Sequence, residues 1–301
     1  MAKNVRMRGS EQQEIVKLVG RMEGRYSKWQ VWQDFILMFA TSIANVFPGP
    51  HREHREKMYL DTAKKYSKQE LENIAHMMAL VVMGMEKDPD QDFLGELFMA
   101  MELGSNWAGQ FFTPYGICQA MATMTYSDEI VKTQCEQNGF ISVSDPACGA
   151  GALLIAFANA CKSHGMNYQE RALFIAQDID VLAGMMCYIQ LSLMGCAGHV
   201  IVDNTLTKPA QFYDRRALLP VDGTNVWTTP MMYSDTWQIR QIAAKMDLMT
   251  RFPKDALEKT VKQLEPVAVE IKPKKKVQVV QKDPEPVESL PADESGQLVL
   301  F

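Results

Sequence analysis

Several features that would assign the chain to a common functional class are absent from its sequence. The six cysteines include no Cys-Xaa-Xaa-Cys pair and follow no secretory signal, so we expect reduced thiols in a cytoplasmic protein. The longest apolar stretch, Met77–Met85, is too short to span a bilayer, so we expect no membrane segment. The net charge of −5 provides no overall attraction to nucleic acid, and DNA binding would therefore need a local basic surface or a tether.

The first third of the chain has the pattern of a helical domain. The residues that recur at three- and four-residue steps are Trp29, Trp32, Phe35, Ile36 and Phe39, and they predict one apolar helix face packed in a core. Two capping-box patterns, at Ser10 and at Ser67, predict helix starts. His51 and His54 lie in a run of mixed charge typical of a solvated helix face, so we expect no metal site there.

From about residue 106 strands and helices alternate, which predicts a parallel sheet with crossover helices. The expected strands are Phe140–Ser144, Leu173–Ala176 and His199–Val202, and the expected helices are Ala152–Cys161, Leu182–Met194 and Ser234–Met249. These strands are the first half of a doubly wound sheet, whose ligand lies outside the carboxyl ends of the strands. A fourth strand between Asn204 and Thr229 is doubtful because that span has little strongly apolar sequence.

The end of the chain differs in composition from the rest. Residues 265–296 contain five prolines, five lysines and seven acids but no aromatic residue, which is typical of a disordered segment. We therefore divide the chain into a helical N-terminal domain at 1–105, an α/β domain at 106–264 and a disordered tail at 265–301.

The most specific pattern of the chain is Asp145–Gly151, which reads DPACGAG between a predicted strand and a predicted helix. Glycines at this place let the backbone approach a ligand closely and direct the N-terminus of the helix at it. An acid at the tip of the strand suits a ligand that carries a cation beside polar groups. From the residues alone, an ordinary strand-turn-helix crossover is the alternative. A nicotinamide-binding Rossmann loop fits poorly, because its third glycine position is Leu154 and the leading Asp-Pro is foreign to it.

The same pattern resembles the S-adenosylmethionine (SAM) loop of the N6-adenine DNA methyltransferases, whose usual form is Asp-Pro-Ala-Cys-Gly-Ser-Gly. The resemblance implies a SAM-dependent methyltransferase fold, which is an α/β Rossmann-like parallel sheet. The cofactor-loop residues that it implies are Asp145, Pro146, Ala147, Cys148, Gly149 and Gly151.

A second segment strengthens the resemblance. The sequence GQFFTP ends at Thr113-Pro114 and precedes a helical pattern, in which Thr113 is expected to be the cap and Pro114 to lie in the first turn. Type I restriction-modification subunits and their relatives carry a similar segment before the SAM loop. By that resemblance, Thr113 contacts the methionine end of the cofactor.

Two polar positions follow the second and third predicted strands. Asp178 can accept hydrogen bonds from ribose hydroxyls, and the resemblance makes it the ribose ligand; Asp180 is expected to cap the next helix. The resemblance also makes Asn204 the contact beside the adenine ring. An Asn/Asp turn that leaves the strand is the other interpretation of Asn204.

The acceptor motif of this family is not found. N6-adenine methyltransferases carry (Asn/Asp)-Pro-Pro-(Tyr/Phe) after the fourth strand, where it binds the target amino group and stacks on the flipped base. The sequence contains no such tetrapeptide. The weak candidates for catalysis are Thr229, Pro230 and Tyr233, which also fit a plain strand end.

The last five residues resemble a second known motif, the Gln-Leu-Xaa-Leu-Phe peptide by which bacterial polymerases and repair proteins dock on the sliding clamp. The clamp-binding candidates are Gln297, Leu298, Leu300 and Phe301. Apolar anchors on a tether favour docking on a partner, and a strand that folds back onto the domain is the alternative.

Together these observations predict a type I-like DNA methyltransferase that moves the methyl group of SAM to N6 of adenine in DNA. The alternative is a catalytically degenerate, SAM-binding or DNA-associated accessory subunit that needs a partner subunit or is tethered to the sliding clamp. Methylation of RNA or protein by the same cofactor fold is a third interpretation.

Overall fold

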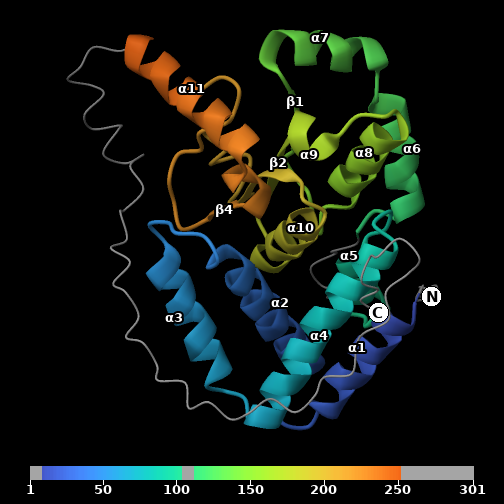
Figure 1. Cartoon of the computed structure of the whole chain (residues 1–301). Helices are drawn as coiled ribbons and strands as arrows, with labels where there is room; N and C mark the ends of the chain where they lie inside the picture. The colour runs from blue at the N-terminus through green and yellow to red at the C-terminus, as the bar shows by residue number, and fades with distance from the viewer. Residues whose placement is uncertain (1–8, 104–111, 252–301) are drawn as a thin grey trace, which may run out of the picture. The chain divides into compact units, whose positions relative to one another are not determined.

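The computed structural model of the 301-residue chain describes residues 9–103 and 112–251. The first of these ranges is helical, as predicted (Figure 1). Its elements are α1 (Ser10–Arg21), α2 (Lys28–Ala44), α3 (Arg52–Ala63), α4 (Lys68–Lys87) and α5 (Phe93–Ala100). The predicted apolar face of α2 is core at Trp32, Phe35, Ile36 and Phe39, which are all buried. The prediction is wrong for Trp29, which lies in the first turn of the helix and is 39% exposed. The expected boundary between the two domains, at 105–106, lies outside the described residues.

One of the two capping-box predictions is confirmed and the other is wrong. At α4 the Ser67 hydroxyl accepts from the Glu70 amide, and the Glu70 carboxylate accepts from the Ser67 amide in return. At α1 the cap is Gly9, and no side chain caps the helix. Ser10 already lies in the first turn, where its hydroxyl donates to Glu11 at 3.1 Å.

The second range is the predicted α/β part. Its elements are α6 (Tyr115–Thr125), α7 (Asp128–Asn138), β1 (Ile141–Asp145), α8 (Ala152–Ser163), α9 (Tyr168–Arg171), β2 (Ala172–Asp178), α10 (Val181–Leu193), β3 (Ala197–Val202), β4 (Val226–Thr228), the 3-10 turn η1 (Pro230–Tyr233) and α11 (Asp235–Arg251). The prediction of parallel strands at the first three positions is confirmed. The doubtful fourth strand exists, but it is short and runs antiparallel to β3.

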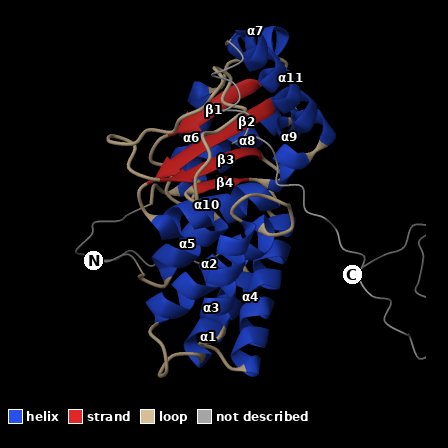
Figure 2. Ribbon diagram, turned by 90° about the vertical axis from the view of Figure 1, so that its left-hand side faces the viewer, coloured by secondary structure: helices blue, strands red, loops and turns tan. Residues whose placement is uncertain are grey.

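The sheet has the order β1-β2-β3-β4 and helices on both faces (Figure 2). One face packs on α8 and α10, in a core that also includes α2 and α5. On the other face, Leu173 and Ala197 contact Leu218, Leu219 and the side chain of Trp237 from α11. The helical N-terminal part and the sheet therefore share one hydrophobic core, with α10 between them. Within the described residues, no helix combines the length and the apolar character that a membrane span needs.

Candidate cofactor site

The carboxyl ends of the three parallel strands lie together at one end of the sheet, where the loops that follow them are joined by backbone hydrogen bonds. Cys148 N–H, after β1, donates to Gln177 O of β2 at 3.0 Å. Asp203 N–H, after β3, donates to Asp178 O at 3.0 Å. The predicted glycine loop, Asp178 and Asn204 are thereby brought together at the edge where ligands bind in folds of this type.

The glycine loop has a backbone that other residues would strain. Gly149 has φ +54° and Gly151 has φ +96°, both in the left-handed region. A Cβ on Gly151 would lie 2.9 Å from the Cys187 sulfur of α10, and one on Gly149 would lie 3.0 Å from the Phe112 ring. The two glycines are therefore required by the turn and by close neighbours, and the loop places the N-terminus of α8 at the strand ends.

Asp145 is the charged group at the tip of β1. Its Oδ1 accepts from Ala147 N–H at 3.1 Å. Burial raises the pKa of the Asp145 carboxyl, and the negative charge of Asp178 adds to this effect. Burial and the nearby acid both disfavour the charged form of Asp145, and a bound cationic ligand would stabilise that form.

Asp178 joins the glycine loop to the start of α10. Its Oδ2 accepts from Gly149 N–H at 2.8 Å, and its Oδ1 accepts from Asp180 N–H at 2.9 Å. Each carboxylate oxygen retains capacity to accept another hydrogen bond. The predicted capping role of Asp180 is confirmed, since its carboxylate accepts from Leu182 N–H and Ala183 N–H at 2.7 and 3.0 Å.

Asn204 lies in a tight turn after β3. Its Oδ1 accepts from the amides of Leu206 and Thr207 at 2.9 and 3.1 Å, as the turn interpretation expected. The neighbouring Thr205 hydroxyl donates to the carbonyl of Pro146 at 2.6 Å, which ties this turn to the glycine loop. The turn and the proximity to the loop therefore occur together.

The prediction that Thr113 caps α6 is wrong. The helix begins at Tyr115 with Pro114 at the cap position, and no side chain caps it. Pro114 has an extended ψ of 133°, so the chain reaches the helix one residue later than the pattern predicted. Thr113 is exposed, and its carbonyl accepts from the Cys118 thiol at 3.8 Å. Its neighbour Phe112 is the residue that contacts the glycine loop.

Two buried amides support the site, and the sequence analysis did not identify them. Gln190 of α10 donates to Ala150 O and to Asp92 Oδ1, both at 2.8 Å, and accepts from Leu94 N–H at 3.0 Å. Gln177 at the end of β2 donates to Asp203 O at 3.1 Å and accepts from Ala210 N–H at 2.8 Å. A single amide within an otherwise apolar run was the signal for both.

The weak catalytic candidates lie at the other end of the sheet. Because β4 is antiparallel to β3, its carboxyl end points to the start of β3. The buried Thr229 hydroxyl donates to Cys196 O at 2.7 Å and accepts from Gly198 N–H at 2.9 Å. Pro230 follows in η1, and Tyr233 stacks on Phe47 with ring centroids 4.3 Å apart. The structure does not bring these residues to the glycine loop.

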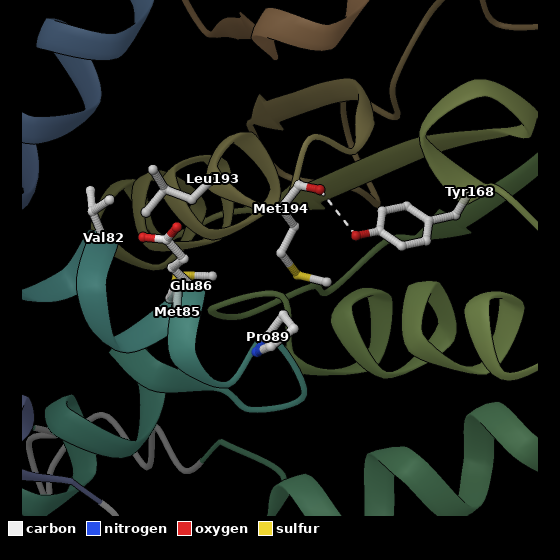
Figure 3. Close-up of a pocket in the computed structure, with 7 residues that line it drawn as sticks. All are labelled: Val82, Met85, Glu86, Pro89, Tyr168, Leu193 and Met194. Carbon is white, nitrogen blue, oxygen red and sulfur yellow. Dashed lines mark hydrogen bonds between the residues drawn. The ribbon is translucent and has the colours of Figure 1, made fainter. Parts of the chain in front are cut away.

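A cavity of about 400 Å³ also lies away from the loop (Figure 3). It lies between α4 and the residues that precede β2 and β3, and the Tyr168 hydroxyl donates to Met194 O within it at 3.1 Å. Since those residues are at the amino ends of the strands, this cavity does not belong to the candidate site. The clamp-binding candidates Gln297, Leu298, Leu300 and Phe301 lie outside the described residues.

Comparison with known proteins gives a family for this architecture. A family model described as N-6 DNA methylase matches residues 92–263. Among solved structures, the chain is similar to a protein of Listeria monocytogenes provisionally assigned as a class I S-adenosylmethionine-dependent methyltransferase. The two share 14% sequence identity with a TM-score of 0.40, over 84% of this chain and 79% of the other. No curated protein matches the chain.

Proposed function

Because the chain belongs to the N-6 DNA methylase family, we propose that it binds SAM at the glycine loop and directs the methyl group to N6 of adenine in DNA. The observation that carries the proposal is the loop itself. Gly149 and Gly151 form a turn in which a side chain at either position would crowd its neighbours. Asp178 Oδ2 holds this turn by accepting a hydrogen bond from the Gly149 amide.

The residues at the loop have the chemistry that SAM requires. Asp145 is a partly buried carboxylate with a raised pKa, which supports a role as the counter-ion of the positive end of the cofactor. Asp178 has acceptor capacity for ribose hydroxyls, and Asn204 has an amide beside the loop for the adenine ring. Pro146, Ala147, Cys148 and Thr113 complete the proposed cofactor contacts. When bound, SAM would supply an electrophilic methyl group on a sulfonium ion.

The second candidate function is that of a SAM-binding subunit that needs a partner for catalysis. Two observations favour it: the sequence contains no (Asn/Asp)-Pro-Pro-(Tyr/Phe) tetrapeptide, and Thr229 lies at the far end of the sheet. The proposal therefore assigns no catalytic acceptor to the chain. Either function keeps the same cofactor site, and DNA remains the expected substrate of the assembled enzyme.

The test combines methyl transfer with cofactor binding. The full chain is incubated with SAM labelled in its methyl group and with adenine-containing duplex DNA, and N6-methyladenine is measured by mass spectrometry. SAM binding is titrated in parallel. Label in N6-methyladenine supports the first function, whereas binding without transfer supports the second. If SAM does not bind at all, both candidate functions are refuted.

We also propose that the terminal peptide docks on the sliding clamp, which would hold the protein near DNA despite its acidic net charge. The proposal rests on the sequence Gln297-Leu298-Val299-Leu300-Phe301, in which apolar anchors follow a proline-rich, charged segment. A purified bacterial clamp should bind the full chain and not a chain that ends at residue 296. The two chains should unfold at the same temperature; a large drop for the shorter one would mean that the peptide packs on the domain.

A further inference from the structure

One side of the α/β part is much less buried than the rest. We call α6, α7 and β1 together the β1 flank. Nearly every residue of β2 and β3 is buried, whereas in β1 only Ile141 is, and Ser142 and Ser144 are exposed. Parallel strands are normally covered on both faces. The strand that carries the candidate cofactor loop is therefore the least covered strand of the parallel set.

β1 is also the end strand of the sheet, and its outer edge is open. Within residues 9–103 and 112–251, no second strand pairs with it and no backbone–backbone hydrogen bond reaches Ile141–Asp145 from outside the sheet. Such an edge presents unpaired amide and carbonyl groups to which another strand can bind.

The opposite edge of the sheet is covered by this chain itself. The Arg55 guanidinium donates to the outward carbonyl of Val226 at 2.8 Å, and its charge lies over the Trp227 ring. Beside it, His51 pairs with Asp222 at 2.9 Å. The helical N-terminal part thus covers the outer edge of β4. Of the two outer strands of the described sheet, only β1 therefore has an edge without such contacts.

The helices of the β1 flank have an uncovered apolar surface. Residues 111–127, which include α6, contain no charged side chain. Ile117, Met121 and Met124 repeat at helical spacing and are 52%, 45% and 86% exposed, while the other side of α6 packs on α8. A helix whose exposed surface faces water normally carries charges, whereas the centre of a protein interface is poor in charge and rich in methionine and aromatic residues.

The next helix, α7, is also thinly packed. It has no buried residue, and Ile130 is largely exposed. A hollow of about 730 Å³ separates α7 from the end of α8 and from α9. Figures 1 and 2 both show α7 beyond β1, past the end of the sheet. α7 is therefore only loosely packed against the rest of the described chain, at the amino end of the sheet.

The strand order indicates what belongs beside the open outer edge of β1. In a doubly wound sheet of order 3-2-1-4-5-6, the fourth strand pairs with the outer edge of the first, and the ligand crevice lies between their carboxyl ends. The described strands supply only the 3-2-1 side of this crevice. A parallel strand added to β1 would place its carboxyl end about 5 Å from Asp145–Pro146.

On the basis of the proposed function, we propose that the β1 flank is the assembly surface for a different polypeptide that adds a parallel strand beside β1. The partner segment is uncharged, matching the lack of charge on 111–127, and its apolar side chains cover Met121 and Val143. Its strand ends in an Asn or Asp side chain that accepts a hydrogen bond from the target amino group.

A second copy of this chain does not fit that role. Twofold symmetry would pair β1 with its copy in the antiparallel direction. The start of the partner's strand would then lie beside Asp145, so no carboxyl-end acceptor would reach the loop. The outer edge of β1 would then be paired, but the ligand crevice would still lack its second side.

Photocrosslinking tests where the partner binds. The full chain carries benzoylphenylalanine at Met121 of α6 or at Ser142 of β1, and at Met83 of α4, which is 55% exposed, as the control. Cells that produce the chain are irradiated, and crosslinked peptides are identified by mass spectrometry. We expect one polypeptide other than this chain from the first two positions only, attached through a strand-forming segment that ends in Asn or Asp. The proposal is overturned by no adduct, by an adduct of the chain with itself alone, or by equal yields at Met83.

Reconstitution with that purified polypeptide tests the surface in solution. The double variant Met121→Glu/Met124→Glu should weaken the complex at least about tenfold by placing charge in the interface, and Met83→Glu should leave the affinity unchanged. Met124→Glu alone alters a side chain that is 86% exposed, so its effect cannot arise from a disrupted core. Unchanged affinity in both α6 variants overturns the proposal.

A SAM titration of the same proteins separates the two proposals. If the complex forms as expected but SAM does not bind, the cofactor assignment fails and the assembly surface stands. If SAM binds and no complex depends on α6, the assembly surface fails alone. Hydrogen exchange should also slow in the complex at those amides of β1 that point away from β2, since pairing with a second strand protects them.

Discussion

Replacing Gly151 by alanine should destabilise the protein more than the same change at another glycine of similar backbone. Gly151 has φ +96°, and the left-handed conformation alone costs a residue with a Cβ about 1–2 kcal/mol. The new Cβ would also lie 2.9 Å from the Cys187 sulfur and 3.4 Å from the Cys187 Cα. Overpacking of this kind costs about 1–3 kcal/mol more. We therefore expect a total loss of about 2–5 kcal/mol in the free energy of unfolding.

Gly165 provides the matched control. It has φ +76° and is exposed, and a Cβ there would meet no atom within 4 Å. Gly165→Ala should therefore show only the backbone cost of about 1–2 kcal/mol. In a Cys187→Ala background the cost of Gly151→Ala should become smaller, because the nearest clashing atom is removed.

Urea unfolding, followed by circular dichroism, measures the stability of Gly151→Ala, Gly165→Ala, Cys187→Ala and the double variant Gly151→Ala/Cys187→Ala. SAM titration shows whether the glycine loop of each variant still binds the cofactor. The reasoning is refuted if Gly151→Ala and Gly165→Ala have equal unfolding midpoints and slopes. It is also refuted if the Cys187→Ala background leaves the cost of Gly151→Ala unchanged.

Three further predictions concern the pH dependence and the buried amides. Burial raises the pKa of Asp145 in the free protein, and a bound cation would favour the charged carboxylate. SAM affinity should therefore fall as the pH drops through that raised pKa. SAM titrations across a pH series should show this fall in the unmodified protein and not in Asp145→Asn. Burial lowers the pKa of His199 to about 4 from 6.5, so the unfolded chain takes up the proton first and stability should decrease by on the order of 3 kcal/mol as the pH falls between these values. Chemical denaturation should show this loss in the unmodified protein, and equal loss in His199→Gln would contradict it. Gln190→Leu should cost about 2–4 kcal/mol and weaken SAM binding, because the buried Leu94 amide and Ala150 carbonyl lose their partner; an unchanged melting temperature would show that the amide does not support the loop.

Local patterns were sufficient to predict the structure of the glycine loop. The strand, the glycine turn and the following helix at 140–161 are adjacent in sequence, and each has its own propensity and turn chemistry. The cap by Asp180 was predictable for the same reason, since its hydrogen bonds reach only two and three residues ahead. At Thr113 the same kind of rule failed, because the extended Pro114 takes the cap position instead.

Features that depend on distant pairing were not predictable. β4 runs antiparallel to β3, and Arg55 from the N-terminal part donates to its outer edge at Val226; neither contact has a local signature in the sequence. That direction alone moves Thr229 to the amino end of the sheet. Gln190 shows the same limit, because it joins Asp92 to the glycine loop across 98 residues of sequence.

The most direct test of the central claim is a calorimetric titration of SAM into the full chain and into Asp145→Ala, with Asp61→Ala as the control for removal of an exposed carboxylate. The proposed site predicts binding of one SAM per chain to the unmodified protein and to Asp61→Ala, and loss of binding in Asp145→Ala. Equal affinity in all three proteins, or no binding to any of them, would contradict the assignment of the glycine loop as the SAM site.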